Sequence, residues 1–517
     1  MLKLRWKIDK KKDKDILFFT FVWGILTHGI MFFNKFSFFD ELHYMFGVGH
    51  TYPLGRWMLG IMESITKFLF GSGLFSLPVL NGGISLLCLA VAICIIVRIL
   101  EIENRWGIIV ICGVMVAFPT ITCMFAYMYT APYYMVGFLL GVIGIGCVCS
   151  EKMNIVSLLT GAILFACAIG VYQAFIPFML CLLLIYFMNE ILKNRINNWY
   201  IFARKTVYLG SFCGLALAIY YLVLQVFLKC LKLKLSGYKG ANEDGLILSN
   251  LNEYKWRVIL AYQEFFQPSE DGEYLFWNMY PWNMQKIYYI LIALIALVSI
   301  FFIIYLGKEN IMKSIWFVLL LMLLPLGINF IFIMVNKWSV YALTNYSQVM
   351  IFVFFVWLIE NVKMLKINWG KWIYGGGIAL ILFSGISYSR YANVCYLNAE
   401  LMRNQMISYY TTLITRIQSG EGYREELPIV FINGGQKESL DWAKMEEFQD
   451  IAIEAYRWDV TINDNSWVRF MEYYCGYAPT MIEDVTMFED MQEVKEMPCY
   501  PNDGSIQIIN DTIIVKF

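Results

Sequence analysis

The sequence predicts an all-α membrane protein that crosses a bilayer about eleven times and carries a small α/β domain outside the membrane. Apolar residues make up 59% of the chain and charged residues only 15%, whereas a soluble globular protein has roughly 25% charged residues. The apolar residues come in blocks of about 20, which is the length a helix needs to cross the bilayer hydrocarbon. Lys and Arg gather in alternate connections between these blocks, as the positive-inside rule predicts for cytoplasmic loops.

Residues 1–15 form a basic tail in front of the first apolar block. Seven of them are Lys or Arg, and the apolar run at residues 16–33 follows directly. This order is also typical of a signal peptide, but no small-residue cleavage site follows and further apolar blocks continue along the chain. We therefore interpret residues 16–33 as a retained first span, with the N-terminus in the cytoplasm.

Further spans follow as far as residue 386, which gives a membrane domain over residues 16–386. They are expected at residues 74–99, 107–124, 132–149, 155–169, 174–187, 207–227, 287–306, 315–335, 349–359 and 373–386. An odd number of spans puts the two ends of the chain on opposite sides of the membrane.

The basic residues of the short connections agree with this topology. Connections assigned to the cytoplasm carry Arg98, Arg105, Lys152, Lys193, Arg195, Arg204, Lys205, Lys308, Lys313, Lys363, Lys366 and Lys371. The short outer connections at 127–131, 170–173 and 336–347 carry only Lys337. The C-terminal part is therefore expected outside. The formal net charge is zero, so the composition predicts no nucleic-acid partner.

Two outer connections are long. Residues 34–73 include an amphipathic stretch at 57–70, in which Glu63 and Lys67 are four residues apart. Residues 229–285 mix Gly, Asn and acidic residues with many aromatic residues, Trp256 among them. Both connections are expected to form re-entrant or membrane-surface structure.

Residues 387–517 have the composition of a soluble domain. A long polar helix is expected at 390–418, followed by a buried strand at 427–432. The last residues predict a hairpin around Asn510 and Asp511. Most of the 13 Cys lie in apolar blocks and show no zinc or haem pattern, while Cys395, Cys475 and Cys499 leave room for one disulfide if this domain is extracytoplasmic.

Two adjacent carboxylates, Asp40 and Glu41, stand at the outer end of the first span. Aromatic residues flank them, so partial burial is expected, and a carboxylate there can act as a general base toward a hydroxyl group. The alternative is a solvated acidic loop.

Arg56 follows in the same connection, just before the amphipathic stretch. Its planar guanidinium suits a phosphate group, although taken alone this residue favours contact with lipid headgroups. His43 and His50 with the two carboxylates suggest a metal site, but separations of three and seven residues match no compact zinc pattern, so no metal is predicted.

Two further outer hinges carry uncharged polar groups. In the hinge at 170–173, Tyr172 is typical of an interfacial aromatic belt, whereas the amide of Gln173 needs partners where water is scarce. The hinge at 127–134 is aromatic and uncharged, and we interpret it as part of the aromatic belt.

The order of these features resembles the bacterial glucosyltransferase family of O-antigen serotype conversion, which is similar in plan to the GT-C class of membrane glycosyltransferases. The resemblance covers roughly residues 16–386 and is carried by Asp40, Glu41, Tyr44, the run Leu54, Gly55 and Arg56, and then Tyr172 and Gln173. It implies a multi-pass enzyme of the bacterial cytoplasmic membrane that transfers a hexosyl group, glucosyl in this family, with inversion. The implied partners are a polyprenyl-phosphate sugar donor, a cell-surface glycan acceptor on the outer face and membrane lipid.

The resemblance also assigns roles to residues. Asp40 would be the general base with Glu41 as its neighbour, Arg56 would stabilise the departing phosphate with His43 in the same phosphate site, and Tyr44, Tyr172 and Gln173 would line the cavity. No cofactor is implied, and a divalent metal is compatible but not predicted. Related sequences carry an Asp in the hinge at 127–134, whereas this hinge has none. The alternatives are a transporter or lipid flippase, and a glycan polymerase or ligase that uses lipid-linked sugars.

Overall fold

The computed structural model describes residues 9–36, 39–49, 51–73, 75–150, 153–236, 251–268, 284–335, 340–365, 370–433, 448, 451, 453, 456 and 466–517. Helices make up 76% of the structure, which confirms an all-α polytopic plan. The chain divides into two compact units. The first comprises Met1–Lys35 and Phe46–Asn393, and the second comprises Phe36–Met45 and Val394–Phe517.

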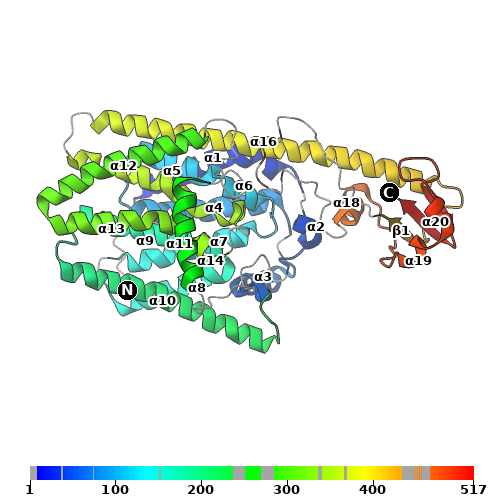
Figure 1. Ribbon diagram of the computed structural model, residues 1–517, viewed down its shortest axis with the longest axis horizontal. Coiled ribbons are helices and arrows are strands. Elements are labelled where there is room, and N and C mark those ends of the chain that lie inside the picture. The colour runs from blue at the N-terminus through cyan, green and yellow to red at the C-terminus, as the bar shows by residue number, and fades with distance from the viewer. Residues whose placement is uncertain are drawn as a thin grey trace. The chain divides into compact units, whose positions relative to one another are not determined.

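The first unit is a bundle of apolar helices (Figure 1). Its α-helices are α1 (Lys10–Phe33), α3 (Trp57–Phe70), α4 (Pro78–Ile99), α5 (Arg105–Ala117), α6 (Pro119–Phe125), α7 (Ala131–Val148), α8 (Ile155–Val171), α9 (Ile176–Leu192), α10 (Trp199–Cys230), α11 (Leu251–Phe266), α12 (Met284–Glu309), α13 (Ile311–Ile328), α14 (Ile331–Met334), α15 (Met350–Asn361) and the first part of α16 (Gly370–Gln418). Short 3-10 helices join several of them: η1 (Tyr52–Leu54), η2 (Gln173–Phe175), η5 (Ala342–Thr344), η6 (Tyr346–Val349) and η7 (Val362–Leu365).

Within the described residues, nine helices are long and apolar enough to cross a membrane. The pair α5 and α6, bent by 44° at Phe118, raises the number to ten if it forms one span. The bend follows from Pro119, because a proline disfavours helical backbone at the residue before it. α8 is a shorter apolar helix of 17 residues at the place of another expected span. The structure thus shows nine or ten spans by length and composition, against the eleven expected.

The helices of the bundle begin in two ways, depending on the end at which they start. α1, α5, α8, α10 and α13 start at an Asp or Asn whose side chain accepts a hydrogen bond from a backbone N–H of the first turn: Asp9, Asn104, Asn154, Asn198 and Asn310. α4, α7 and α9, which run in the opposite direction, start with a proline in the first two positions: Pro78, Pro132 and Pro177. The chain direction therefore defines two ends of the bundle, each with its own chemistry.

Small residues let neighbouring helices approach closely. A Cβ on Gly144 of α7 would lie 2.8 Å from the carbonyl oxygen of Gly161 in α8, and a Cβ on Gly161 would lie 2.8 Å from the oxygen of Gly144. Such mutual contact between glycine backbones is typical of helix packing in membranes, where van der Waals contact replaces the hydrophobic effect. It holds α8, and with it the hinge at Tyr172, against α7.

The second unit contains a three-stranded sheet in the order β1-β3-β2. β1 (Ile429–Ile432) pairs parallel with β3 (Thr512–Lys516), and β2 (Ile506–Ile509) pairs antiparallel with β3. The turn between β2 and β3 consists of Asn510 and Asp511, both in the left-handed conformation. This is the predicted hairpin, formed because Asn and Asp tolerate positive φ angles in a two-residue turn.

The remaining described helices of this unit are α2 (Phe39–Tyr44), the second part of α16, α18 (Ser466–Cys475), α19 (Thr486–Glu489) and α20 (Gln492–Glu496). The structure also bears on the domain boundary and on the disulfide that the sequence left open. The expected last span and the polar helix after it form one helix, α16, so the boundary placed at 386/387 falls inside a helix. Among the three described cysteines of this unit, Cys475 and Cys499 are free thiols, so none of the three conceivable disulfides is formed.

Candidate functional site

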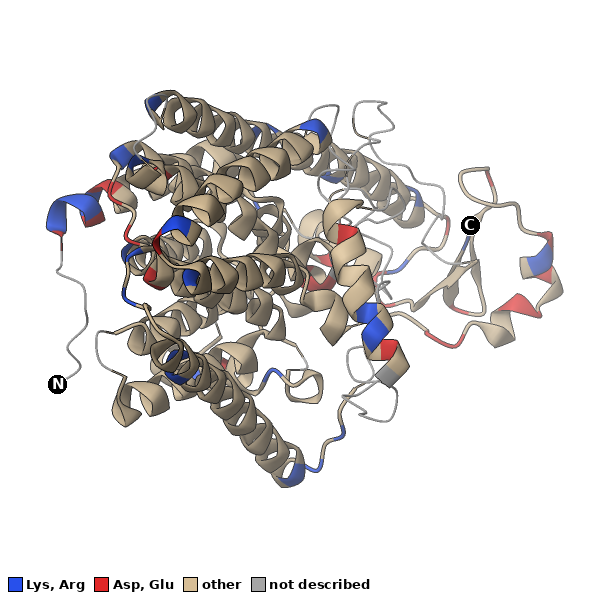
Figure 2. Ribbon diagram, turned by 60° about the vertical axis from the view of Figure 1, so that its left-hand side comes forward, with Lys and Arg blue, Asp and Glu red and all other residues tan. Residues whose placement is uncertain are grey.

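Charged residues gather at one end of the bundle, where Figure 2 shows Lys, Arg, Asp and Glu close together and long uncharged stretches beyond them. This charged end is where α1, α5, α8, α10, α13 and α16 begin. We call the opposite end, where α4, α7 and α9 begin, the phenolic end.

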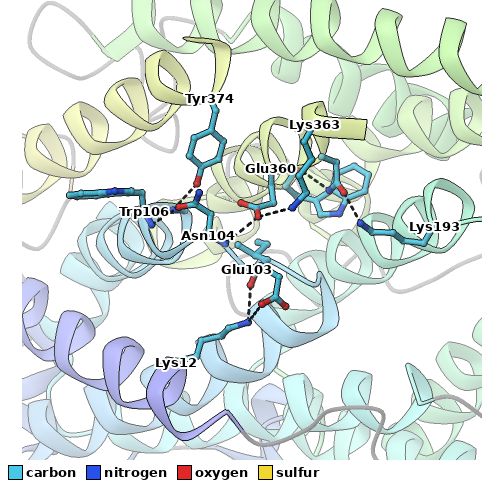
Figure 3. A network of polar contacts seen from close by, with 12 residues as sticks. Lys12, Glu103, Asn104, Trp106, Lys193, Glu360, Lys363 and Tyr374 are labelled. Carbon is cyan, nitrogen blue, oxygen red and sulfur yellow. Dashed lines mark hydrogen bonds and ion pairs between the residues drawn. The ribbon is translucent and has the colours of Figure 1, made fainter. Parts of the chain in front are cut away.

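Ion pairs and hydrogen bonds connect the helices at the charged end. Figure 3 shows several of these contacts: Lys12 Nζ with Glu103 Oε2 at 2.7 Å, the Asn104 N–H with Glu360 Oε1 at 3.1 Å, Lys193 Nζ with Asn361 Oδ1 at 3.0 Å, and the Gly107 N–H with Tyr374 Oη at 3.1 Å. Glu190 is buried and accepts from both Arg195 and Lys205, and Arg195 also pairs with Glu101. Lys12, Arg195 and Lys205 have carboxylate partners and Lys193 has an amide partner, which indicates a structural role.

Arg56 stands in a different environment at the phenolic end. It is the N-cap residue of α3, and its Nη1 donates to Tyr134 Oη at 3.0 Å. Its guanidinium lies 5.0 Å from the ring centre of Tyr172, and that ring stacks on Tyr134 with 4.8 Å between centres. The Nε atom is buried and makes no hydrogen bond. Within the described part of the first unit, no carboxylate pairs with this guanidinium.

The surroundings keep Arg56 charged. Burial alone lowers the pKa of a guanidinium, but the ordinary value is so high that Arg56 stays protonated, and the hydroxyl of Tyr134 accepts one of its N–H bonds. Burial raises the pKa of Tyr172, which therefore stays a neutral phenol. The cluster consequently carries a net positive charge, and it sits at the N-terminus of α3, where the helix dipole also favours an anion.

A tight turn directs Arg56 into this cluster. Gly55 has φ = 77°, and a Cβ there would lie 2.6 Å from Tyr220 Oη and 2.7 Å from Gln173 Nε2. The Gln173 amide donates to the Leu54 carbonyl at 3.0 Å and to Tyr220 Oη at 3.1 Å, and Tyr220 Oη donates to the Gly55 carbonyl at 3.1 Å. Gln173 and Tyr220 thus hold the backbone next to Arg56.

The structure brings Arg56, Tyr172 and Gln173 close together. Gln173 contacts the turn at Leu54 and Gly55, and Tyr172 lines a small cavity of about 10 Å³, which is near the volume of a single water position. Sequence reasoning missed Tyr220 and interpreted Tyr134 as part of an aromatic belt. The signal for Tyr220 was a phenol inside a span, since a hydroxyl at membrane depth requires a partner.

The acidic pair belongs to the second unit. Asp40, Glu41, His43 and Tyr44 form most of the short helix α2, which packs against α18. Glu41 is fully buried and Asp40 is partly buried, while His43 is exposed and shares a 3.1 Å hydrogen bond with Ser466 Oγ. His50 lies outside the described residues. In the part of the chain that the structure describes, no three His, Cys, Asp or Glu side chains form a group that could hold a metal ion.

A comparison with known protein families supports an enzyme. The family model described as glucosyl transferase GtrII matches residues 29–354. The chain belongs to this family. The match confirms the resemblance stated from the sequence, and it includes Asp40, Arg56 and Tyr172. As a member of the GtrII family, the protein is a multi-pass membrane glycosyltransferase that moves a sugar from a donor to an acceptor.

Family membership decides between an enzyme and a transporter in favour of the enzyme. Residues 355–517, with most of the second unit, lie beyond the matched region. Neither the curated proteins nor the solved structures give a match to the chain.

Proposed function

We propose that the protein transfers a glucosyl group from a polyprenyl-phosphate sugar to a glycan on the outer face of the bacterial cytoplasmic membrane. The observation that carries this proposal is the buried guanidinium of Arg56, which meets phenols and has an unused N–H donor on Nε. A buried cation needs a counter-charge. A phosphate supplies that charge and accepts two parallel hydrogen bonds from a guanidinium.

The helix that starts at Arg56 supports a donor with a lipid part. α3 is amphipathic, and its C-terminal half exposes Ile65, Phe68, Leu69 and Phe70, of which Phe68 is 87% exposed. A helix of this kind lies in the membrane interface with its apolar side toward the acyl chains. A polyprenyl chain can run along this apolar side while its phosphate reaches Arg56.

The distribution of charge supports transfer on the outer side of the membrane. Lys12, Arg98, Arg105, Arg195 and Lys205 all lie at the charged end, whose connections are the basic ones. The positive-inside rule assigns such connections to the cytoplasm, so we assign the phenolic end with Arg56 to the outside. Transfer on that side suits a donor carried by a lipid rather than by a soluble nucleotide.

The reaction is a single displacement at the anomeric carbon of the donor. The acceptor hydroxyl forms a new bond to C1 while its proton passes to the Asp40 carboxylate, with Glu41 as the neighbouring acid. The bond from C1 to the phosphate oxygen breaks, and polyprenyl phosphate leaves with the electron pair. Arg56 stabilises the charge that develops on this leaving group, and the family resemblance assigns His43 to binding of the donor phosphate. Attack opposite the leaving group inverts the anomeric configuration.

Replacing Asp40 tests the base. We expect Asp40→Asn to lower the transfer rate by about 100-fold or more, because positioned proton transfer contributes roughly 10² to 10⁴. The assay uses purified protein in lipid nanodiscs, polyprenyl-phosphate glucose and a glycan acceptor. Glu63→Gln serves as the control, since Glu63 is an acidic residue of the same outer connection that pairs with Lys67.

Two results would contradict the proposal. One is a rate above a third of the wild-type rate for Asp40→Asn. The other is a preference for UDP-glucose or for a polyprenyl-pyrophosphate sugar, since the latter donor would indicate a glycan polymerase or ligase.

A further inference from the structure

One face of α11 carries polar and aromatic side chains in a regular pattern. Glu253 and Leu260 lie three or four residues from the adjacent pair Trp256 and Arg257, and Gln263 lies three residues after Leu260, which places the five on the same side of the helix. The residues behind this face are buried, with Ala261 at 0% and Phe265 at 7% exposure. α11 therefore presents one face outward and packs the other into the bundle.

That face lines a cavity of about 270 Å³, which is completed by Phe332 of α14 and by Val335. Two hydrogen bonds hold α11 against α13: Asn329 Nδ2 donates to the Ala261 carbonyl at 3.0 Å, and Tyr262 Oη donates to the Met322 carbonyl at 2.7 Å. The wall of the cavity is therefore formed without a ligand. The volume of the cavity is slightly below the roughly 300 to 1,000 Å³ of drug-sized ligand pockets.

The lining combines an open aromatic face with fixed polar groups. Trp256 is 70% exposed although it lines the cavity. Arg257 Nε donates to Glu253 Oε1 at 3.0 Å, and Arg257 Nη1 donates to the Ile333 carbonyl at 3.2 Å. These bonds fix the guanidinium and the carboxylate in the wall of the cavity that Trp256 also lines. Gln263 adds an amide, which both donates and accepts hydrogen bonds.

We propose that this cavity binds a hexose ring of the acceptor glycan, an inference that rests on the proposed transfer to a glycan. A pyranose ring has an apolar face of C–H groups, which suits the Trp256 indole. Its rim of hydroxyl groups donates to the Glu253 carboxylate and accepts from Arg257 and Gln263. A carboxylate, a guanidinium and an amide in one cavity can form hydrogen bonds with several sugar hydroxyls, whereas an acyl chain offers them no hydrogen-bond partner.

The cavity lies at the same end of the bundle as Arg56. Val335 lines the cavity, and Tyr341, six residues further along the chain, is a neighbour of Arg56. Six residues of fully extended chain span at most roughly 22 Å. A glycan of a few sugar units can therefore occupy this cavity while one of its hydroxyls reaches the donor.

Saturation-transfer NMR on the full chain in lipid nanodiscs tests the inference without any donor. The probes are methyl glycosides of glucose, galactose, mannose, rhamnose and N-acetylglucosamine. We expect at least one of them to receive saturation from the wild-type protein. Trp256→Ala should weaken that signal about five-fold, and Trp256→Tyr should keep most of it because an aromatic face remains. Trp256 is exposed, so neither variant disturbs the core.

Two variants serve as controls. Trp372→Ala removes another exposed tryptophan, near the start of α16, and Arg56→Ala removes the phosphate site, and both should leave the signal unchanged. If no probe binds, or if Trp256→Ala binds as the wild type does, the inference is overturned and Trp256 only anchors α11 in the membrane interface. If Arg56→Ala loses the signal and Trp256→Ala keeps it, the sugar binds elsewhere and the inference is again overturned. Because no donor is present, failure of the proposed donor chemistry would not change these signals.

Discussion

Two cation sites, one at each end of the helical bundle, differ in the groups that surround the positive charge. At the charged end, the buried Glu190 binds Arg195 and Lys205, and similar pairs connect α1, α4 and α5. At the phenolic end, Arg56 contacts Tyr134 and Tyr172, and no described carboxylate of the first unit pairs with it. A cation whose counter-charge belongs to the protein serves the fold, whereas a cation without one is available to an anionic substrate.

Removal of Arg56 gives the largest expected effect. Arg56→Ala should lower the rate of transfer from polyprenyl-phosphate glucose by about 10² to 10³-fold, as removal of one charge-stabilising donor typically does. Arg56→Lys keeps the charge but loses the planar fork, so we expect an intermediate loss of about ten-fold. Arg105→Ala is the control, because Arg105 pairs with Asp15 at the charged end and is 66% exposed. A transfer rate near wild type for Arg56→Ala would show that Arg56 does not stabilise an anionic substrate.

Replacing Glu190 tests whether the ion pairs at the charged end stabilise the fold. Glu190→Ala leaves Arg195 and the buried Lys205 without their shared carboxylate, so the free energy of unfolding should fall by about 3 kcal/mol. Thermal unfolding in detergent measures this loss, and transfer per folded molecule should stay within two-fold of wild type. Glu103→Ala breaks an exposed pair with Lys12 and should lower the stability by at most about 1 kcal/mol. Loss of transfer by folded Glu190→Ala would give the charged end a part in the reaction.

Alanine variants of two glycines distinguish the effect of backbone strain from the effect of a displaced Arg56. Gly55 and Gly71 have nearly equal positive φ angles, 77° and 75°, so alanine strains both turns by roughly 1 to 2 kcal/mol. At Gly71 the new Cβ meets nothing within 4 Å, whereas at Gly55 it collides with Tyr220 and Gln173. We expect Gly55→Ala to lower the transfer rate about ten-fold and Gly71→Ala to leave it unchanged. Equal transfer rates in the two variants would show that the turn does not position Arg56.

The smallest effect is expected from two phenols of α10. Tyr220→Phe removes the hydrogen bonds to the Gly55 carbonyl and from Gln173, so transfer should fall about five-fold, in line with roughly 1 kcal/mol for one bond. Tyr208 lies nearer the charged end of the same helix and donates to the Asn154 carbonyl at 3.2 Å. Tyr208→Phe should leave transfer unchanged, and steady-state rates in nanodiscs compare the two. An equal fall in both variants would point to a general loss of α10 packing.

The parts that sequence reasoning predicted correctly depend on local pattern. The hairpin around Asn510 and Asp511 is one of them, and the helix at 57–70, which the structure shows as α3, is another. Both follow from alternation, helical periodicity and turn chemistry within about 15 residues. The apolar blocks predict spans, and the structure has apolar helices at those places. Pro119 indicates the helix break at Phe118, but the span expected at 107–124 does not include this break.

Other features could not be derived in this way. Nothing in the local pattern indicates that α16 continues past residue 386, since the composition changes from apolar to polar within one helix. The segment Asp40–Tyr44 follows the first span in sequence but belongs to the second unit, with the chain after residue 393. Its partner Ser466 lies 423 residues from His43. Such contacts depend on the packing of distant segments.

By itself, the sequence determined that this protein spans a membrane many times, and it singled out Asp40, Arg56, Tyr172 and Gln173, because apolar length and scarce polar groups stand out in lipid. Only the tertiary structure decided what surrounds Arg56. Tyr134 is 78 residues away in sequence, and it reaches the guanidinium because α7 begins at the end of the bundle where α3 also begins. The charge of a residue is a local property, but whether a carboxylate or a phenol faces that charge depends on how the helices pack.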